Sequence, residues 1–208
     1  MSLKYAEHLA DHMFIDGWYI DETVCDSILN WREEQEQQGS CFSGRVGDAV
    51  IHTDHKDSLD VLLPVDGYHT DIYFNELQKV FGEYMEKYEW CNKYSAWGPL
   101  ERTCVQKYGP GQGFHGWHAE RTGGSGLVSR RHLVFMTYLN DVTDGGETEW
   151  VYQNLKVKPE KGLTVIWPAD WTFTHRGITS ETQTKIIVTG WAHYVDNMID
   201  EQWARHIQ

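Results

Sequence analysis

Residues 185–194 read KIIVTGWAHY, and their side chains alternate between two faces with the period of a β-strand. The residues on the first face are Lys185, Ile187, Thr189, Trp191 and His193. A lysine on a face that points into a protein core requires an anionic partner, because an unpaired buried ammonium group is strongly destabilising. The stretch therefore predicts a strand whose inner face would be satisfied by a bound carboxylate.

Short strand-like segments fill most of the chain from residue 102 to this stretch, and Gly, Asp, Asn and Pro residues separate them. The predicted strands cover residues 102–108, 112–118, 132–140, 147–152, 154–158, 162–167, 172–176 and 185–194. Such a series predicts an antiparallel double sheet, that is, a double-stranded β-helix of the jelly-roll, cupin-like kind. The Tyr138 hydroxyl would lie inside this barrel and needs a hydrogen-bond partner there.

The N-terminal half of the chain contains two segments with helical periodicity. After a short strand at 14–20, Asp21 or Thr23 is expected to cap a helix that runs to about Gln38. A second helix is expected over 71–88. Loops and short strands are expected over 40–68.

The expected fold class is mainly β with N-terminal helices, two or more of which pack on one outer face of the jelly roll. At 208 residues the chain suits a single domain. Within it we expect a helical and loop support region at 1–99, a jelly-roll catalytic core at 100–194 and a C-terminal tail at 195–208.

The charge of the chain limits which partners it can bind, and its cysteines indicate its cellular location. The chain has 18 Lys and Arg against 31 Asp and Glu, a net charge of −13, which disfavours binding to nucleic acid or to anionic membranes. The four cysteines include no CxxC pair, and neither a signal-peptide hydrophobic region nor a membrane-spanning apolar run is seen. We therefore expect free thiols, a cytoplasmic location, and a small-molecule or peptide substrate.

The segment 108–120, YGPGQGFHGWHAE, ends in the triplet His118-Ala119-Glu120. Residues two apart in a strand point to the same side, so this imidazole and carboxylate can converge on one ion. His175 is the best candidate for a third ligand, whereas His115 would face the other way. Two histidines and one carboxylate on one face of a metal form the arrangement that non-haem Fe(II) oxygenases use.

Several of these segments, in this order, resemble the 2-oxoglutarate/Fe(II)-dependent dioxygenases of the prolyl 4-hydroxylase-like group. The resemblance spans about residues 100–194. The matching residues are Tyr108-Gly109-Pro110-Gly111-Gln112, His118-Ala119-Glu120, Tyr138-Leu139-Asn140-Asp141, Gly145-Gly146-Glu147-Thr148, Lys161-Gly162, His175, Lys185 and Trp191.

The resemblance implies that His118, Glu120 and His175 bind Fe(II) and form the catalytic centre. Lys185 would pair with the distal carboxylate of 2-oxoglutarate. The further cofactor-binding residues that it implies are Tyr138, Tyr108, Thr148 and Trp191. The implied reaction hydroxylates a C–H bond with O2 as co-substrate and releases succinate and CO2; a prolyl residue in a peptide is the first expectation for the target.

The sequence departs from the group in two places. Glu120 stands where the group usually has Asp, and the segment from Tyr108 to His118 is one residue longer. That extra residue can set the strand back far enough for the longer side chain to reach the metal. Alternatively, two histidines and water bind the iron, and Glu120 lies outside the coordination shell.

Two other protein classes remain as alternatives. A cupin-like binding protein or a metal-dependent isomerase would use a further histidine and would not need Lys185, and a degenerate relative would keep the fold without the chemistry. At the mouth of the site, we expect either a mobile loop or an ordinary hairpin at 121–131. Exposed tryptophans, Trp117 and Trp150, are expected to shape recognition, and Arg176 to hold either a substrate anion or a loop carbonyl.

Overall fold

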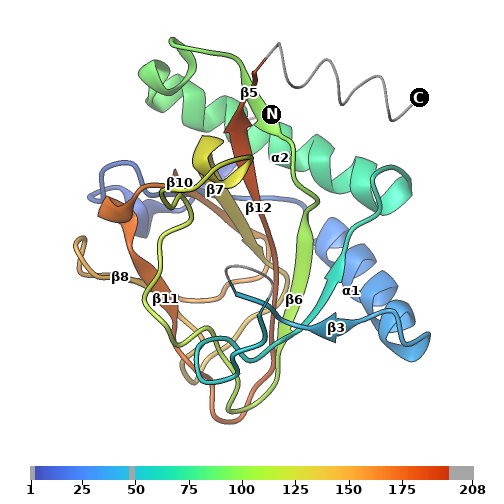
Figure 1. Cartoon of the computed structure of the whole chain (residues 1–208). Coiled ribbons are helices and arrows are strands. Elements are labelled where there is room, and N and C mark those ends of the chain that lie inside the picture. Colours follow the sequence, from blue (N-terminus) through green and yellow to red (C-terminus); the bar gives the residue numbers. More distant parts are fainter. Residues whose placement is uncertain (1–2, 47–49, 197–208) are drawn as a thin grey trace.

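A computed structural model describes residues 3–46 and 50–196 of the chain. Its centre is a large antiparallel sheet of nine strands, and a second antiparallel sheet of three strands lies apart from it (Figure 1). Along the large sheet the strands are β1 (Lys4–Tyr5), β2 (Asp16–Tyr19), β10 (Leu163–Pro168), β7 (Arg131–Tyr138), β12 (Lys185–Tyr194), β6 (Cys104–Tyr108), β4 (Leu59–Leu62) and β3 (Phe42–Ser43), with β5 (Trp97–Pro99) paired to β12. The small sheet has the order β11 (His175–Gly177), β8 (Thr148–Trp150) and β9 (Leu155–Val157).

Strand β12 has the predicted bounds and lies in the middle of the large sheet, between β7 and β6. One of its faces packs into a hydrophobic cluster with the helices, through residues such as Ile186, Val188 and Ala192. The other face carries Lys185 and Trp191 into a cavity on the far side of the sheet. The alternation seen in the sequence is therefore confirmed, because each row of side chains meets a different environment.

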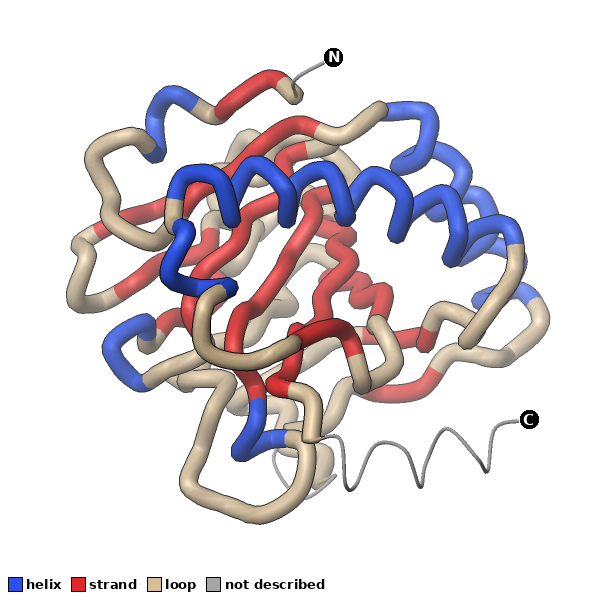
Figure 2. Tube along the Cα trace, turned by 90° about the horizontal axis from the view of Figure 1, so that it is seen from above, coloured by secondary structure: helices blue, strands red, loops and turns tan. Residues whose placement is uncertain are grey.

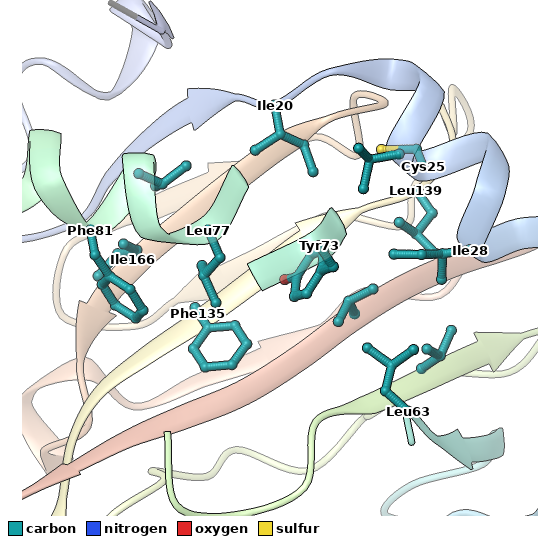
Figure 3. Packing of buried hydrophobic residues seen from close by; sticks show 14 of the residues in the cluster. Ile20, Cys25, Ile28, Leu63, Tyr73, Leu77, Phe81, Phe135, Leu139 and Ile166 are labelled. Carbon is teal, nitrogen blue, oxygen red and sulfur yellow. The ribbon is translucent and has the colours of Figure 1, made fainter. Parts of the chain in front are cut away.

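Two helices, α1 (Glu22–Gln37) and α2 (Tyr68–Lys87), lie together across one face of the large sheet (Figures 1 and 2). The Asp21 carboxylate caps α1 by accepting a hydrogen bond from the Thr23 amide at 2.8 Å, as predicted. Helix α2 begins three residues earlier than expected. The helices and the sheet enclose a core that includes Tyr73, Leu77, Phe81, Phe135 and Ile166 (Figure 3).

A glycine in β12 sets how closely α2 approaches the sheet. Gly190 lies opposite Phe135 of β7, and a Cβ atom at this position would overlap the Phe135 ring. That ring packs edge-on against Phe81 of α2, with 5.9 Å between ring centroids. The glycine thus leaves the space that lets an aromatic residue fill the gap between helix and sheet.

The prediction of a strand at 112–118 was wrong. Residues 109–112 form a tight turn in which Gly111 has a φ of +80°, and within 112–118 the described pairing is limited to two isolated bridges, Lys56 with Phe114 and His118 with His175. A segment this rich in glycine favours an irregular path over a regular strand. The segment predicted at 172–176 also divides, into a 3-10 turn at Trp171–Phe173 and the strand β11.

In the described part of the chain, no helix is both long and apolar enough to cross a lipid bilayer. The predicted C-terminal tail, apart from its first two residues, lies outside the described residues. The large sheet takes strands from both sides of the boundary expected at residue 100.

Candidate metal centre and co-substrate cavity

His118 and His175 face each other across an antiparallel bridge. The His118 amide donates to the His175 carbonyl at 3.0 Å, and the His175 amide donates to the His118 carbonyl at 2.9 Å. Residues paired in this way project their side chains to the same side, and the two imidazole centroids lie 4.3 Å apart. Backbone hydrogen bonds therefore bring together two histidines that are 57 positions apart in the sequence.

Glu120 completes the cluster. Its Oε1 atom lies 3.4 Å from Nε2 of His118 and 3.4 Å from Nε2 of His175. Two donors at right angles, each about 2.1 Å from one ion, are separated by about 3 Å. The three donor atoms all lie within 4.8 Å of one another, and they form the one such cluster among the described residues. The spacing fits a single transition-metal ion.

The hydrogen bonds of the two imidazoles determine which ring nitrogen is free to bind a metal ion. Nδ1 of His118 lies 2.9 Å from the Gly116 carbonyl, and Nδ1 of His175 lies 3.0 Å from the Phe173 carbonyl. A carbonyl accepts only from a protonated nitrogen, so each ring keeps its proton on Nδ1 and presents the Nε2 lone pair to the cluster. Both rings are thus in the tautomer that a metal requires.

Burial and mutual charge reinforce this donor set. Burial lowers the pKa of His175, and the neighbouring His118 lowers it further, so His175 stays neutral. Burial alone would raise the pKa of Glu120, but its interactions with His118 and His175 hold that pKa well below its ordinary value. The cluster therefore offers two imidazole nitrogens and one carboxylate anion, which suit a divalent cation.

A cavity of about 760 Å³ opens beside this cluster. The predicted site residues in its wall are His118, Glu120, His175, Lys185, Tyr108, Thr148 and Trp191. Tyr138 is not in the wall: its hydroxyl donates to Thr148 Oγ1 at 2.7 Å and so lies behind the threonine. The tyrosine has the buried partner that the sequence required, and it would act on a ligand only through Thr148.

Lys185 is the chemically unusual residue in this wall. Its side chain is 4% exposed, and Nζ donates to the Gly146 carbonyl at 2.9 Å, while no carboxylate of the described residues forms an ion pair with it. The Tyr108 ring lies beside it, 5.1 Å from centroid to Nζ. Burial lowers the pKa of Lys185 to about 8, and Glu147 opposes that shift only in part. An anionic ligand would offset the free-energy cost of burying the ammonium group.

Sequence reasoning missed two charged residues that line the cavity near Glu120. Arg131 and Glu101 also line the cavity, and the Trp191 indole donates to Glu120 Oε2 at 2.9 Å. Two basic residues at 130 and 131 are visible in the sequence, but nothing in their spacing indicates that one of them points inward.

The rim of the cavity partly follows the predictions. Thr122, Gly124, Ser125 and Val128 of the 121–131 segment line it. Trp117 is 43% exposed there, but the prediction for Trp150 was wrong, because Trp150 is fully buried against Trp167 and His175.

Arg176 and His115 both have protein partners. The Arg176 guanidinium stacks on Trp117 and bonds to Glu149 at 2.8 Å, which is a partner that neither expectation included. His115 lies outside the cavity, as predicted, beside Thr179.

Comparison with known proteins identifies the domain. A family model described as the 2OG-Fe(II) oxygenase superfamily matches residues 103–193. These residues form a 2OG-Fe(II) oxygenase domain. The match supports a 2-oxoglutarate/Fe(II)-dependent dioxygenase, an enzyme class that uses Fe(II), 2-oxoglutarate and O2. No curated protein matches the chain.

Solved structures of prolyl hydroxylases share the fold. A Trichoplax adhaerens prolyl hydroxylase in complex with a hypoxia inducible factor peptide fragment has a TM-score of 0.71 at 13% identity, with 90% of this chain and 86% of that chain covered. A Pseudomonas putida prolyl-4-hydroxylase has a TM-score of 0.68 at 15% identity (90% and 96% covered). The collagen prolyl hydroxylase of Paramecium bursaria Chlorella virus-1, in its 2OG complex, has a TM-score of 0.65 at 19% identity (89% and 98% covered). At these identities the likeness establishes the prolyl 4-hydroxylase-like fold.

Proposed function

We propose that the chain hydroxylates a C–H bond of a prolyl residue in a peptide, with release of succinate and CO2. His118, Glu120 and His175 hold the Fe(II) ion, and Lys185 binds the distal carboxylate of 2-oxoglutarate. One observation carries the assignment: the single three-residue metal cluster of the described chain shares a cavity with a buried lysine that has no carboxylate partner there.

Each side chain of the site has a separate task in this proposal. His118 and His175 would each hold the ion through an imidazole nitrogen, and Glu120 would add one negative charge. A set of two histidines and one carboxylate would leave coordination positions free for other ligands. Lys185 and Thr148, farther along the cavity wall, fix the position of a dicarboxylate. When bound, the iron and 2-oxoglutarate supply the oxidising chemistry, which none of these side chains can perform.

The wall of the site also excludes water from the ligand atoms. Phe114 stacks on the His118 ring with 3.7 Å between centroids, and Trp167 packs against His175 at 5.1 Å. A dry, low-dielectric wall strengthens the pairing between an ammonium group and a carboxylate.

The peptidyl substrate is supported by the fold and by the open rim. The Trichoplax relative was solved with a peptide fragment. In this chain Trp117 and the 121–131 segment form a rim that a peptide segment can lie across. The indole of Trp117, stiffened by Arg176, offers a flat apolar surface to a proline ring.

The direct test measures succinate release with a panel of prolyl peptides, free amino acids and small metabolites. We expect a prolyl peptide to stimulate release and His175→Ala to abolish it. His115→Ala is the matched control, because this histidine belongs to the same segment as His118 but lies outside the cavity. Full activity of His175→Ala would remove the ligand assignment, and stimulation by free amino acids alone would overturn the peptide substrate.

A second measurement addresses Lys185. Lys185→Ala should raise the 2-oxoglutarate concentration needed for half-maximal succinate release far more than the Fe(II) concentration, because the ammonium group would pair with the dicarboxylate and is not one of the proposed metal ligands. An equal effect on both requirements would contradict the proposed pairing.

A further inference from the structure

A β-bulge places an unpredicted arginine in the cavity. Strands β7 and β12 pair in regular register from Tyr138 with Ile187 to Leu133 with Ala192, and the register then shifts so that Arg131 pairs with His193. Without the shift, His132 would occupy the cavity face in place of Arg131. Instead His132 packs outside the cavity, against Trp97 and Tyr194. Bulges commonly redirect one side chain next to a functional site.

Arg131 is held on three sides. Its guanidinium lies 3.5 Å from the centre of the Trp191 ring. Two of its nitrogens bond to the two carboxylate oxygens of Glu101, at 3.0 and 2.7 Å. The remaining nitrogen, Nη1, donates to the Glu120 carbonyl at 2.9 Å and lies 3.4 Å from Glu120 Oε2. A planar guanidinium with all its edges engaged is a rigid support.

Glu101 is fixed from behind by a buried histidine. Nε2 of His193 lies 2.7 Å from Glu101 Oε1, and His193 is completely buried. Burial alone would raise the pKa of Glu101, but its bonds to His193 and Arg131 lower that pKa below its ordinary value. The chain of contacts therefore runs from the interior, through an ionised Glu101, to Arg131 and on to Glu120.

The two oxygens of Glu120 have different surroundings. Oε2 accepts from the Trp191 indole at 2.9 Å and faces Arg131, whereas Oε1 faces His118 and His175. A glutamate has one more rotatable bond than an aspartate, so its carboxylate loses more conformational freedom when it is held in one orientation. Contacts on Oε2 remove that freedom before any ligand binds.

We propose that Arg131, Trp191 and Glu101 are positioning residues that hold Glu120 by its outer oxygen and thereby present Oε1 to the metal. This inference rests on the proposed ligand role of Glu120. It assigns to the bulge between β7 and β12 the function of supporting a glutamate, rather than a shorter side chain, as the carboxylate ligand.

The test is metal affinity, measured without 2-oxoglutarate or O2, with Mn(II) and Co(II) as probes. We expect Arg131→Gln to weaken binding by about 10–100-fold, the usual effect of losing an outer-shell partner. Simple electrostatics predicts tighter metal binding instead, because the substitution removes a positive charge near a dication and leaves Glu101 without its arginine partner. Tighter or unchanged binding by the folded variant would therefore overturn the proposal.

Three further variants sharpen the result. Arg131→Lys keeps the charge but not the planar fork, and we expect it not to restore affinity. Trp191→Phe keeps a ring beneath the guanidinium but removes the N–H donor to Oε2, and it should weaken binding in the same direction. Arg121→Gln is the matched control, since the Arg121 side chain pairs with Asp170 and not with the side chain of a proposed ligand; it should bind the probes as the wild type does.

A double-substitution cycle separates this inference from the proposed function. If Glu120→Ala leaves Mn(II) affinity unchanged, the ligand role itself fails. If Glu120→Ala weakens binding, Arg131→Gln should have no further effect in that background, because no carboxylate remains to position. An equal loss in both backgrounds would show that Arg131 acts through the fold and not through Glu120.

Discussion

Replacing Lys185 by methionine should stabilise the protein while it removes co-substrate binding. The lysine is buried with a single carbonyl partner, so the folded protein holds an ammonium group where it is poorly compensated. Methionine has similar length and carries no charge. We therefore expect the free energy of unfolding to rise in Lys185→Met.

The size of the effect follows from the pKa of Lys185. Its displacement from 10.5 to about 8 corresponds to about 3 kcal/mol of unfolding free energy at neutral pH. The lowered pKa means that the protonated lysine destabilises the folded state, because the unfolded chain keeps its proton at pH values where the folded chain releases it. This loss of unfolding free energy is fully present below pH 8. The substitution leaves the Gly146 carbonyl without its donor, which costs about 1–3 kcal/mol. The expected net gain is about 0–2 kcal/mol, obtained as the difference of these two contributions.

Urea unfolding at neutral pH, without metal or 2-oxoglutarate, measures this gain. Lys79→Met, on the exposed side of α2, is the control and should change stability by less than about 0.5 kcal/mol. With Mn(II) and 2-oxoglutarate at about 100 times its Kd, the wild type should gain about 2.7 kcal/mol and Lys185→Met nothing from 2-oxoglutarate. A variant that is much less stable than the wild type, or one that 2-oxoglutarate stabilises equally, would refute the reasoning.

Two other predictions address pH and packing. The affinity of the Mn(II)-loaded protein for 2-oxoglutarate should fall by up to about tenfold per pH unit above pH 8, since Lys185 then loses the proton that pairs with the carboxylate; a flat binding profile between about pH 6.5 and 9.5 would contradict this. Gly190→Ala should destabilise the fold by about 1–3 kcal/mol because its methyl group overlaps Phe135. Gly82→Ala in α2, where no atom lies within 4 Å of the new Cβ, should instead stabilise by about 0.5–1 kcal/mol; equal effects of the two substitutions in urea unfolding would exclude the packing explanation.

Local patterns predicted those parts of the structure that local physics determines. The alternation along β12 gave its bounds, because the two sides of a central strand meet different environments. The Asp21 cap marked the start of α1 because a side-chain oxygen satisfies a free amide at a helix N-terminus. The three residues proposed as ligands were found because His and Glu spacing and a family resemblance indicated them together.

Other features of the structure depend on contacts between residues that are far apart in the sequence. Trp150 looks like a surface residue in sequence, but it is buried because β8 packs it against Trp167 of β10. The segment 112–118 alternates as a strand would, yet its glycines leave it without a continuous partner. Arg131 enters the cavity only because of the bulge between β7 and β12, and a single unpaired residue in a ladder leaves no periodic trace in the sequence.

The central claim is that His118, Glu120 and His175 hold one ferrous ion in the cavity where Lys185 binds 2-oxoglutarate. Anaerobic titration of the protein with Fe(II) and 2-oxoglutarate, followed by visible absorbance, tests it most directly. We expect the weak charge-transfer band of a 2-oxo acid chelated to Fe(II) to appear with one equivalent of iron, to vanish in His175→Ala and to persist in His115→Ala. A band of full intensity in His175→Ala, or no band in the wild type, would contradict the account.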